Sequence, residues 1–67
     1  MTAASDVRLT PEQLSQRWEG QPSPRTLAQW RYLGKGPSYI KVGRLVLYPL
    51  EAVLDFERMN TVRAGAA

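Results

Sequence analysis

Apolar residues first recur at helical spacing near the start of the chain, where Leu14 and Trp18 lie four positions apart. Thr10 followed by Pro11 is a helix cap with a proline at the first helical position, and Gln13 completes a capping box. This pattern predicts a first helix from about Pro11 to Trp18. Its apolar stripe is short, so the helix needs a packing partner to be stable.

Ser23 and Pro24 repeat the cap-then-proline signal and predict a second helix that reaches about Leu33, before a Gly-Lys-Gly-Pro stretch. Leu27 and Trp30 form its buried stripe, which Leu33 can extend. The two tryptophans of the chain therefore read as packing residues rather than as base-stacking ones. The opposite face of the second helix carries, at spacings of three and four, Arg25, Ala28, Gln29 and Tyr32.

The stretches 39–42 and 45–48 are rich in β-branched and aromatic residues and flank a glycine, which predicts a β-hairpin. From about Pro49 the helical spacing returns, and it predicts a third helix to about Asn60. The apolar stripe of that helix would contain Leu50, Val53 and Leu54, extended by Phe56 or Met59.

Two registers of the hairpin stay open. A two-residue turn at 43–44 would put Leu45 and Leu47 on the face of Ile40 and Val42, and bury the leucines there. A three-residue turn through Leu45 would put Val46 and Tyr48 on that face instead. In that case the two leucines would form an exposed apolar strip for a partner protein or a neighbouring copy.

The predicted order of helix, helix, two-stranded hairpin and helix indicates a small, mainly α domain with a β-hairpin, covering residues 8–60. Residues 1–7 and 61–67 are small or polar at both ends and are predicted to be flexible tails. A chain of 67 residues with 43% hydrophobic content can close one small core and leaves no room for a second domain.

Composition removes several function classes. The chain has no cysteine and no histidine, so disulfides, thiolate zinc sites and histidine bases are excluded. Glu51 and Asp55, four positions apart, read as a solvated helix face rather than as catalytic carboxylates, and no enzymatic activity, cofactor, metal or small-molecule substrate is expected. Nine Lys and Arg against six Asp and Glu favour a polyanionic partner.

The longest nearly apolar stretch, residues 45–50, is far shorter than the roughly 20 residues that a bilayer requires, so no membrane span is expected. The first residues lack the basic start and apolar core of a signal peptide, which places the protein in the cytoplasm.

Three strings carry a resemblance to a known family. They are Leu9-Thr10-Pro11-Glu12-Gln13-Leu14, then Ser23-Pro24-Arg25-Thr26-Leu27 with Trp30-Arg31, and Gly36-Pro37 with Tyr39-Ile40-Lys41-Val42-Gly43-Arg44 and Tyr48. Over residues 8–58 the chain resembles the excisionase and AlpA-type family related to MerR DNA-binding domains. That resemblance implies a winged helix-turn-helix fold.

The resemblance also implies where DNA would bind. The second helix would enter the major groove, with contacts from Ser23, Arg25, Thr26, Ala28 and Gln29. Arginine pairs with guanine and glutamine with adenine. The hairpin wing and its surroundings would contact the backbone or the minor groove through Arg31, Lys35, Tyr39, Lys41 and Arg44. Leu45 and Leu47 depart from the basic or polar residues common in relatives, and are candidates for protein contact.

As that resemblance implies, the protein would be a phage excisionase that binds and bends attachment-site DNA and directs an integrase toward excision. Its partners would be double-stranded DNA, a phage integrase and adjacent copies of itself, at the nucleoid of a bacterial host. The strings do not separate an excisionase from a small transcriptional regulator. A protein-interaction adaptor that uses the leucines and the basic residues is the third alternative.

Overall fold

The computed structural model describes residues 7–62, which form three helices and one three-stranded antiparallel sheet. In chain order the elements are β1 (Arg8–Leu9), α1 (Pro11–Arg17), α2 (Pro24–Leu33), β2 (Ile40–Val42), β3 (Leu45–Pro49) and α3 (Leu50–Met59). Of the predicted tails, residues 1–6 and 63–67 lie outside this range.

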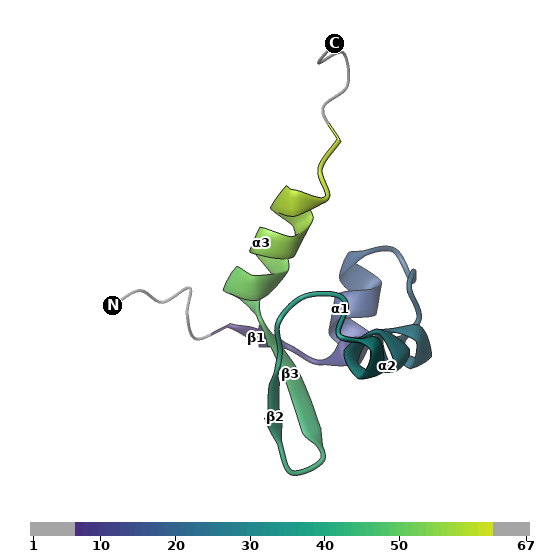
Figure 1. Ribbon diagram of the computed structural model, residues 1–67, viewed down its shortest axis with the longest axis vertical. Helices are drawn as coiled ribbons and strands as arrows, with labels where there is room; N and C mark the ends of the chain where they lie inside the picture. Colours follow the sequence, from purple (N-terminus) through teal and green to yellow (C-terminus); the bar gives the residue numbers. More distant parts are fainter. Residues whose placement is uncertain (1–6, 63–67) are drawn as a thin grey trace, which may run out of the picture.

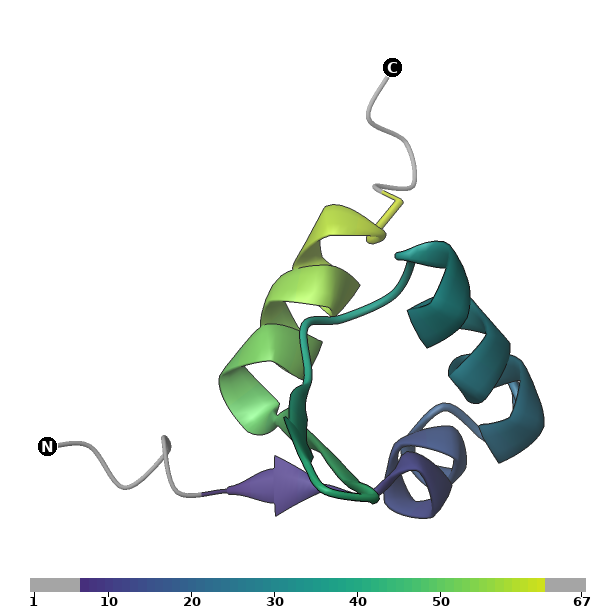
Figure 2. The ribbon, with the colours of Figure 1, turned by 60° about the horizontal axis from the view of Figure 1, so that its bottom comes forward.

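The hairpin of β2 and β3 projects from one end of the molecule, and α3 rises from the other end of β3 (Figure 1). The two helices α1 and α2 lie together on one side of the sheet. Figure 2 shows the segment after α2 turning back across the molecule, past α3, before it enters β2. The connection between α2 and β2, residues 34–39, therefore brings the chain from α2 past α3 to the hairpin.

Local capping sets where the first two helices begin. The Thr10 hydroxyl accepts a hydrogen bond from the Gln13 backbone N–H at 3.1 Å, and the Gln13 side chain accepts one from the Thr10 N–H at 2.9 Å. The Ser23 hydroxyl accepts from the Thr26 N–H at 3.3 Å, ahead of Pro24. Both predicted helix starts are confirmed, because capping depends only on neighbours in sequence.

The turn between α1 and α2 begins one residue earlier than predicted, with Trp18 as the cap of α1 rather than its last residue. Glu19 has a φ of 67°, in the left-handed region. Its N–H donates to the Gln16 carbonyl at 3.0 Å, and the Gly20 N–H donates to the Ser15 carbonyl at 2.7 Å. These two bonds form a Schellman motif, which satisfies the last carbonyls of α1 and redirects the chain toward α2.

The short strand β1 was not predicted. Leu9 is paired with Tyr48, and Arg8 is paired with Pro49. The strand order is β1-β3-β2, so β3 lies between its two neighbours. A strand of two residues is too short to show an alternating pattern, and only its pairing with β3 defines it. The predicted mainly α class thus becomes a mixed α/β arrangement.

The hairpin has the two-residue turn at Gly43 and Arg44, with Val42 opposite Leu45 and Ile40 opposite Leu47. Gly43 has a φ of 60°, which glycine adopts without a steric cost in such a turn. The face that contains Leu45 is nevertheless the exposed one, with Val42 63% and Leu45 52% exposed.

The prediction that a two-residue turn buries the leucines is therefore wrong. Tyr48, on the other face of β3, is only 1% exposed and lies in the core. Side chains alternate along a strand, so burying Tyr48 and Val46 on one side turns Leu45 and Leu47 to the other. Leu47 is partly covered there, while Leu45 remains open to solvent.

The core is formed by one fully buried residue from each helix and one from the central strand β3, with partly buried residues packed around them. Its fully buried members are Leu14, Leu27, Tyr48 and Val53, and Leu9, Trp18, Trp30 and Val46 pack against them. Each buried aliphatic side chain contributes about 1.5–3 kcal/mol through the area it removes from water. The predicted stripes of α1 and α2 are confirmed, except that Leu33 is 57% exposed.

The predicted stripe of α3 is only partly right. Val53 is buried and Phe56 is half-buried, but Leu54 is 37% and Met59 78% exposed. The Phe56 ring lies 5.7 Å from the Trp18 ring and 6.1 Å from the Trp30 ring, measured between centroids. Val53 and Phe56, three positions apart, thus form the inward side of α3, and Leu54 lies beside it at the edge of the core.

Candidate nucleic-acid interface

The outer face of α2 is open to solvent along its length. Arg25, Ala28 and Gln29 are exposed, and Tyr32 is 88% exposed. These residues lie three and four positions apart, so they form one ridge on the side of the helix opposite Leu27, which is buried. The ridge presents hydrogen-bonding groups that nothing in the fold of residues 7–62 covers.

A groove of about 480 Å³ separates this ridge from the hairpin. It is lined from α2 by Ala28, Arg31 and Tyr32, and from the hairpin and the residue before it by Tyr39, Lys41, Gly43, Arg44 and Val46. Three of these side chains are cationic and none is a carboxylate. A concave surface with charges of one sign concentrates the electrostatic potential and attracts an anionic ligand.

Arg31 connects α2 to the hairpin beneath this groove. Its Nη1 donates a 2.8 Å hydrogen bond to the Tyr48 hydroxyl. Its Cζ lies 5.7 Å from the centre of the Tyr39 ring and 6.0 Å from that of the Tyr48 ring, and the two rings are 6.1 Å apart. We call Arg31, Tyr39 and Tyr48 the α2–hairpin junction. It holds the cationic side chain against two aromatic faces.

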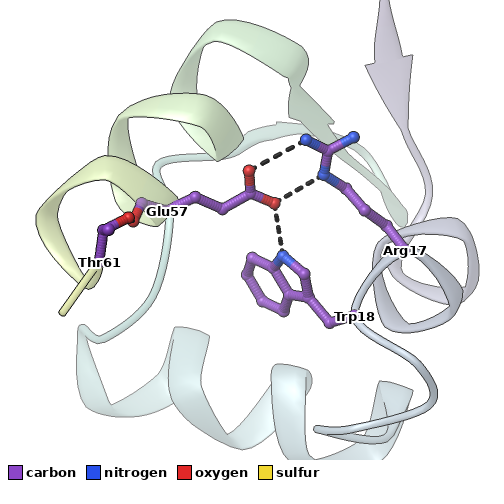
Figure 3. A network of polar contacts seen from close by, with 4 residues as sticks. All are labelled: Arg17, Trp18, Glu57 and Thr61. Atoms are coloured by element: carbon purple, nitrogen blue, oxygen red, sulfur yellow. Dashed lines mark hydrogen bonds and ion pairs between the residues drawn. The ribbon is translucent and has the colours of Figure 1, made fainter. Parts of the chain in front are cut away.

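A second arginine connects α1 to α3 on another side of the molecule (Figure 3). Arg17 donates to the Glu57 carboxylate through Nε at 2.6 Å and through Nη2 at 3.0 Å, and the Trp18 indole N–H donates to the same carboxylate at 2.6 Å. We call Arg17, Trp18 and Glu57 the α1–α3 junction. The Thr61 hydroxyl donates to the Glu57 backbone carbonyl at 2.7 Å, just after α3 ends.

Those contacts change the acidity of the pair. Hydrogen bonds from Arg17, and then from Trp18, stabilise the ionised carboxylate and lower the pKa of Glu57 from 4.5 to about 2. The bond to Glu57 likewise raises the pKa of Arg17. The Glu57 carboxylate is therefore ionised and paired with Arg17 at pH values well above 2.

Several predicted DNA-contact residues lie outside the groove. Ser23 is exposed, but its hydroxyl caps α2 and donates to the Thr26 hydroxyl at 3.2 Å, and Thr26 is half-buried. Lys35 lies beyond the end of α2, with its Nζ 5.9 Å from the centre of the Trp30 ring. Arg25 and Gln29 remain on the exposed ridge beside the groove.

The groove also contains a residue that was not among the predicted contacts. Tyr32 lies on its α2 side, four positions after Ala28 and three after Gln29. Its helical spacing placed it on the outer face, and that spacing was the available signal. An aromatic residue exposed to this extent next to three cationic groups is a further candidate for contact with a ligand.

Leu45 and Leu47 lie on the back of the hairpin, with Ile40 and Val42, facing away from Val46 and the groove. They form a small exposed apolar surface that is separate from the cationic one. Among residues 7–62 no three carboxylates gather into a possible metal site. None of the helices in the same range combines the length and apolar character needed to cross a membrane.

Comparison of the chain with protein-family models, with curated proteins and with solved structures found no match. Residues and geometry therefore define the class: a small mixed α/β domain of three helices and a three-stranded antiparallel sheet, with a cationic groove between α2 and a β-hairpin.

Proposed function

We propose that the protein binds double-stranded DNA as a winged helix-turn-helix domain and acts as an excisionase. The single observation that supports this most is the groove between α2 and the hairpin, lined by Arg31, Lys41 and Arg44 with no carboxylate. An α-helix fits the major groove of B-DNA, and a hairpin beside it can follow the neighbouring phosphates or the minor groove.

In this proposal Arg25 and Gln29 read bases from the exposed ridge of α2. Arginine can donate to O6 and N7 of guanine, and glutamine can pair with N6 and N7 of adenine. Arg31, Lys41 and Arg44 contact phosphates. About three phosphate contacts give a slope of log affinity against log salt of about −2.7, so a single copy binds weakly at cellular salt.

Weak single-site binding gives adjacent copies a role. The apolar back of the hairpin, which includes the exposed Leu45, would contact a neighbouring copy on the same duplex and raise the occupancy of both sites. A row of bound copies beside a crossover site bends the DNA and assembles an integrase for excision. The same domain bound at a promoter would be a transcriptional regulator.

The most direct test replaces a residue of the ridge. Arg25→Ala should weaken binding to the specific site about 10- to 100-fold, because one bidentate base contact is worth about 1–3 kcal/mol. Binding to unrelated duplex should fall much less. Arg58→Ala, which removes an exposed arginine from α3, serves as the matched control. Equal losses on both duplexes would restrict Arg25 to the phosphate backbone.

Footprinting on the genome segment around the gene separates the two roles. Clustered direct repeats beside a recombination crossover site support an excisionase, whereas one protected site over a promoter supports a regulator. Leu45→Glu should leave binding to a single site unchanged and reduce cooperative filling of two adjacent sites. A duplex with two sites that fills with undiminished cooperativity would exclude the hairpin back as the contact between copies.

A further inference from the structure

Arg31 is held in place by groups that carry no charge. Its hydrogen-bond acceptor is the hydroxyl of Tyr48, at 2.8 Å, and its guanidinium lies against the rings of Tyr39 and Tyr48. Glu12 lines the adjoining hollow with Arg31 and Arg44, yet the described residues show no ion pair between Glu12 and either arginine. A phenol accepts a hydrogen bond without cancelling the positive charge.

Two other arginines of the described range are treated differently. Arg17 is paired with Glu57 at 2.6 Å, and Arg58 with Asp55 at 2.6 Å. Each of these side chains is oriented by a carboxylate that also neutralises it. Arg31 is oriented by uncharged groups, so it keeps its full positive charge at the groove that it lines.

The groove side of Arg31 retains hydrogen-bonding capacity. A guanidinium has five N–H donors in a planar fork, and the Tyr48 hydroxyl takes up one nitrogen, Nη1. The remaining donors match the oxygens of a phosphate, for which arginine is suited by its bidentate geometry. A long side chain that is already held also loses less rotamer entropy when it binds.

We infer that Tyr48 is a positioning residue for DNA binding, which acts through Arg31 to present a fixed cationic fork to a backbone phosphate. Tyr48 is 1% exposed, so it reaches DNA only through Arg31. The Tyr39 ring supports the same arrangement, because it lies close to both the Arg31 guanidinium and the Tyr48 ring. This inference rests on the proposed DNA-binding function and adds a buried determinant to it.

A double-mutant cycle tests the inference. Tyr48→Phe removes the hydroxyl and keeps the ring, and Arg31→Lys keeps the charge but removes the fork. The probe is a mixed-sequence duplex of about 20 base pairs at low salt, which is bound through its phosphates. Tyr48→Phe should weaken binding about 3- to 10-fold in the wild-type background and less than about twofold in the Arg31→Lys background.

Tyr48 belongs to the core, so Tyr48→Phe could weaken binding simply by destabilising the fold. A second measurement therefore follows the Arg31 side chain directly, without DNA. The ¹⁵N order parameter of Arg31 Nε in the free protein should fall in Tyr48→Phe, while that of Arg17 Nε, held by Glu57, stays unchanged. Binding is measured below the unfolding transition of every variant, as checked by circular dichroism. A purely structural role of the hydroxyl would lower stability without changing either the cycle or the Arg31 signal.

The outcomes separate the inference from the function beneath it. Equal losses from Tyr48→Phe in both backgrounds, or an unchanged Arg31 order parameter, would overturn the positioning role while DNA binding stands. A wild-type protein that fails to bind the duplex even at low salt would overturn the proposed function and the inference together.

Discussion

The two arginine junctions of this domain are built from similar parts and differ in the acceptor. In the α1–α3 junction Arg17 meets the carboxylate of Glu57, and the same carboxylate accepts the Trp18 indole N–H. In the α2–hairpin junction Arg31 meets the hydroxyl of Tyr48. Both bonds join residues from separate elements, but only the carboxylate of Glu57 neutralises the charge of its arginine.

This difference assigns the two junctions different tasks. An arginine that is paired with a carboxylate contributes to stability and has little net charge to offer a ligand. An arginine that is held by aromatic rings and a phenol contributes less electrostatic stabilisation and keeps its charge for an anion. The α1–α3 junction therefore closes the helices, and the α2–hairpin junction faces the groove in which we propose that DNA binds.

The largest expected effect separates the two arginines by DNA affinity. Arg31→Ala should weaken binding to duplex DNA about 10- to 100-fold, because a hydrogen bond to a charged group is worth about 1.5–3 kcal/mol. Arg17→Ala should change affinity less than about twofold, since its charge is already neutralised. Fluorescence anisotropy titrations of both variants measure this difference, and similar losses for the two would break the comparison.

The second effect concerns stability, for which we expect the α1–α3 junction to matter although it does not affect DNA affinity. Glu57→Gln should lower the free energy of unfolding by about 1 kcal/mol, a value kept small because both partners remain about one third exposed. A loss of this size lowers Tm by about 4–8 °C in a domain of this length. Glu51→Gln, an exposed carboxylate of the same helix, is the matched control. DNA affinity should be unchanged in both variants, and a weakened complex for Glu57→Gln alone would contradict the division of tasks.

The third effect is the pH dependence of the α1–α3 junction. The pKa of Glu57 is about 2 in the folded protein and 4.5 as the unperturbed value, so the folded state favours the ionised form. The resulting stabilisation is fully present above about pH 4.5 and is lost as the pH falls toward 2. It should amount to about 1 kcal/mol or less, because solvent screens the pair.

Chemical unfolding at pH 7, 4 and 2.5 compares wild type with Glu57→Gln. The difference in unfolding free energy between the two proteins should shrink as the pH falls below about 4.5, because Glu57 takes up a proton in the unfolded chain while the folded protein, with a pKa of about 2, keeps it ionised. A difference that stays constant over this range would show that the Glu57 carboxylate stabilises the fold by packing rather than by charge.

The smallest effect is expected at the most exposed pair. The side chains of Arg58 and Asp55 are 72% and 68% exposed, although their N–O distance of 2.6 Å equals the shortest one in the α1–α3 junction. Arg58→Ala should change the free energy of unfolding by less than about 0.5 kcal/mol. A larger change in thermal unfolding would show that distance rather than exposure determines the value of these pairs.

Much of the local structure followed from the sequence alone. Thr10 and Ser23, each followed by a proline, mark the starts of α1 and α2, and Gly34, with a φ of 75°, follows the last residue of α2. The helical spacing within α2 also separated its buried stripe from the outer face that the groove borders. Capping, turn chemistry and helical period depend on residues within four positions of each other, so the sequence contains them.

The tertiary structure decided which hairpin face is buried and what each arginine contacts. The sequence makes the face of Ile40, Val42, Leu45 and Leu47 the more apolar one, yet the packing of Tyr48 in the core leaves that face outward. Arg31 meets a partner 17 positions away, and Arg17 meets one 40 positions away. Such contacts form only when distant elements pack together, and no local pattern distinguishes an arginine that will be neutralised from one that keeps its charge.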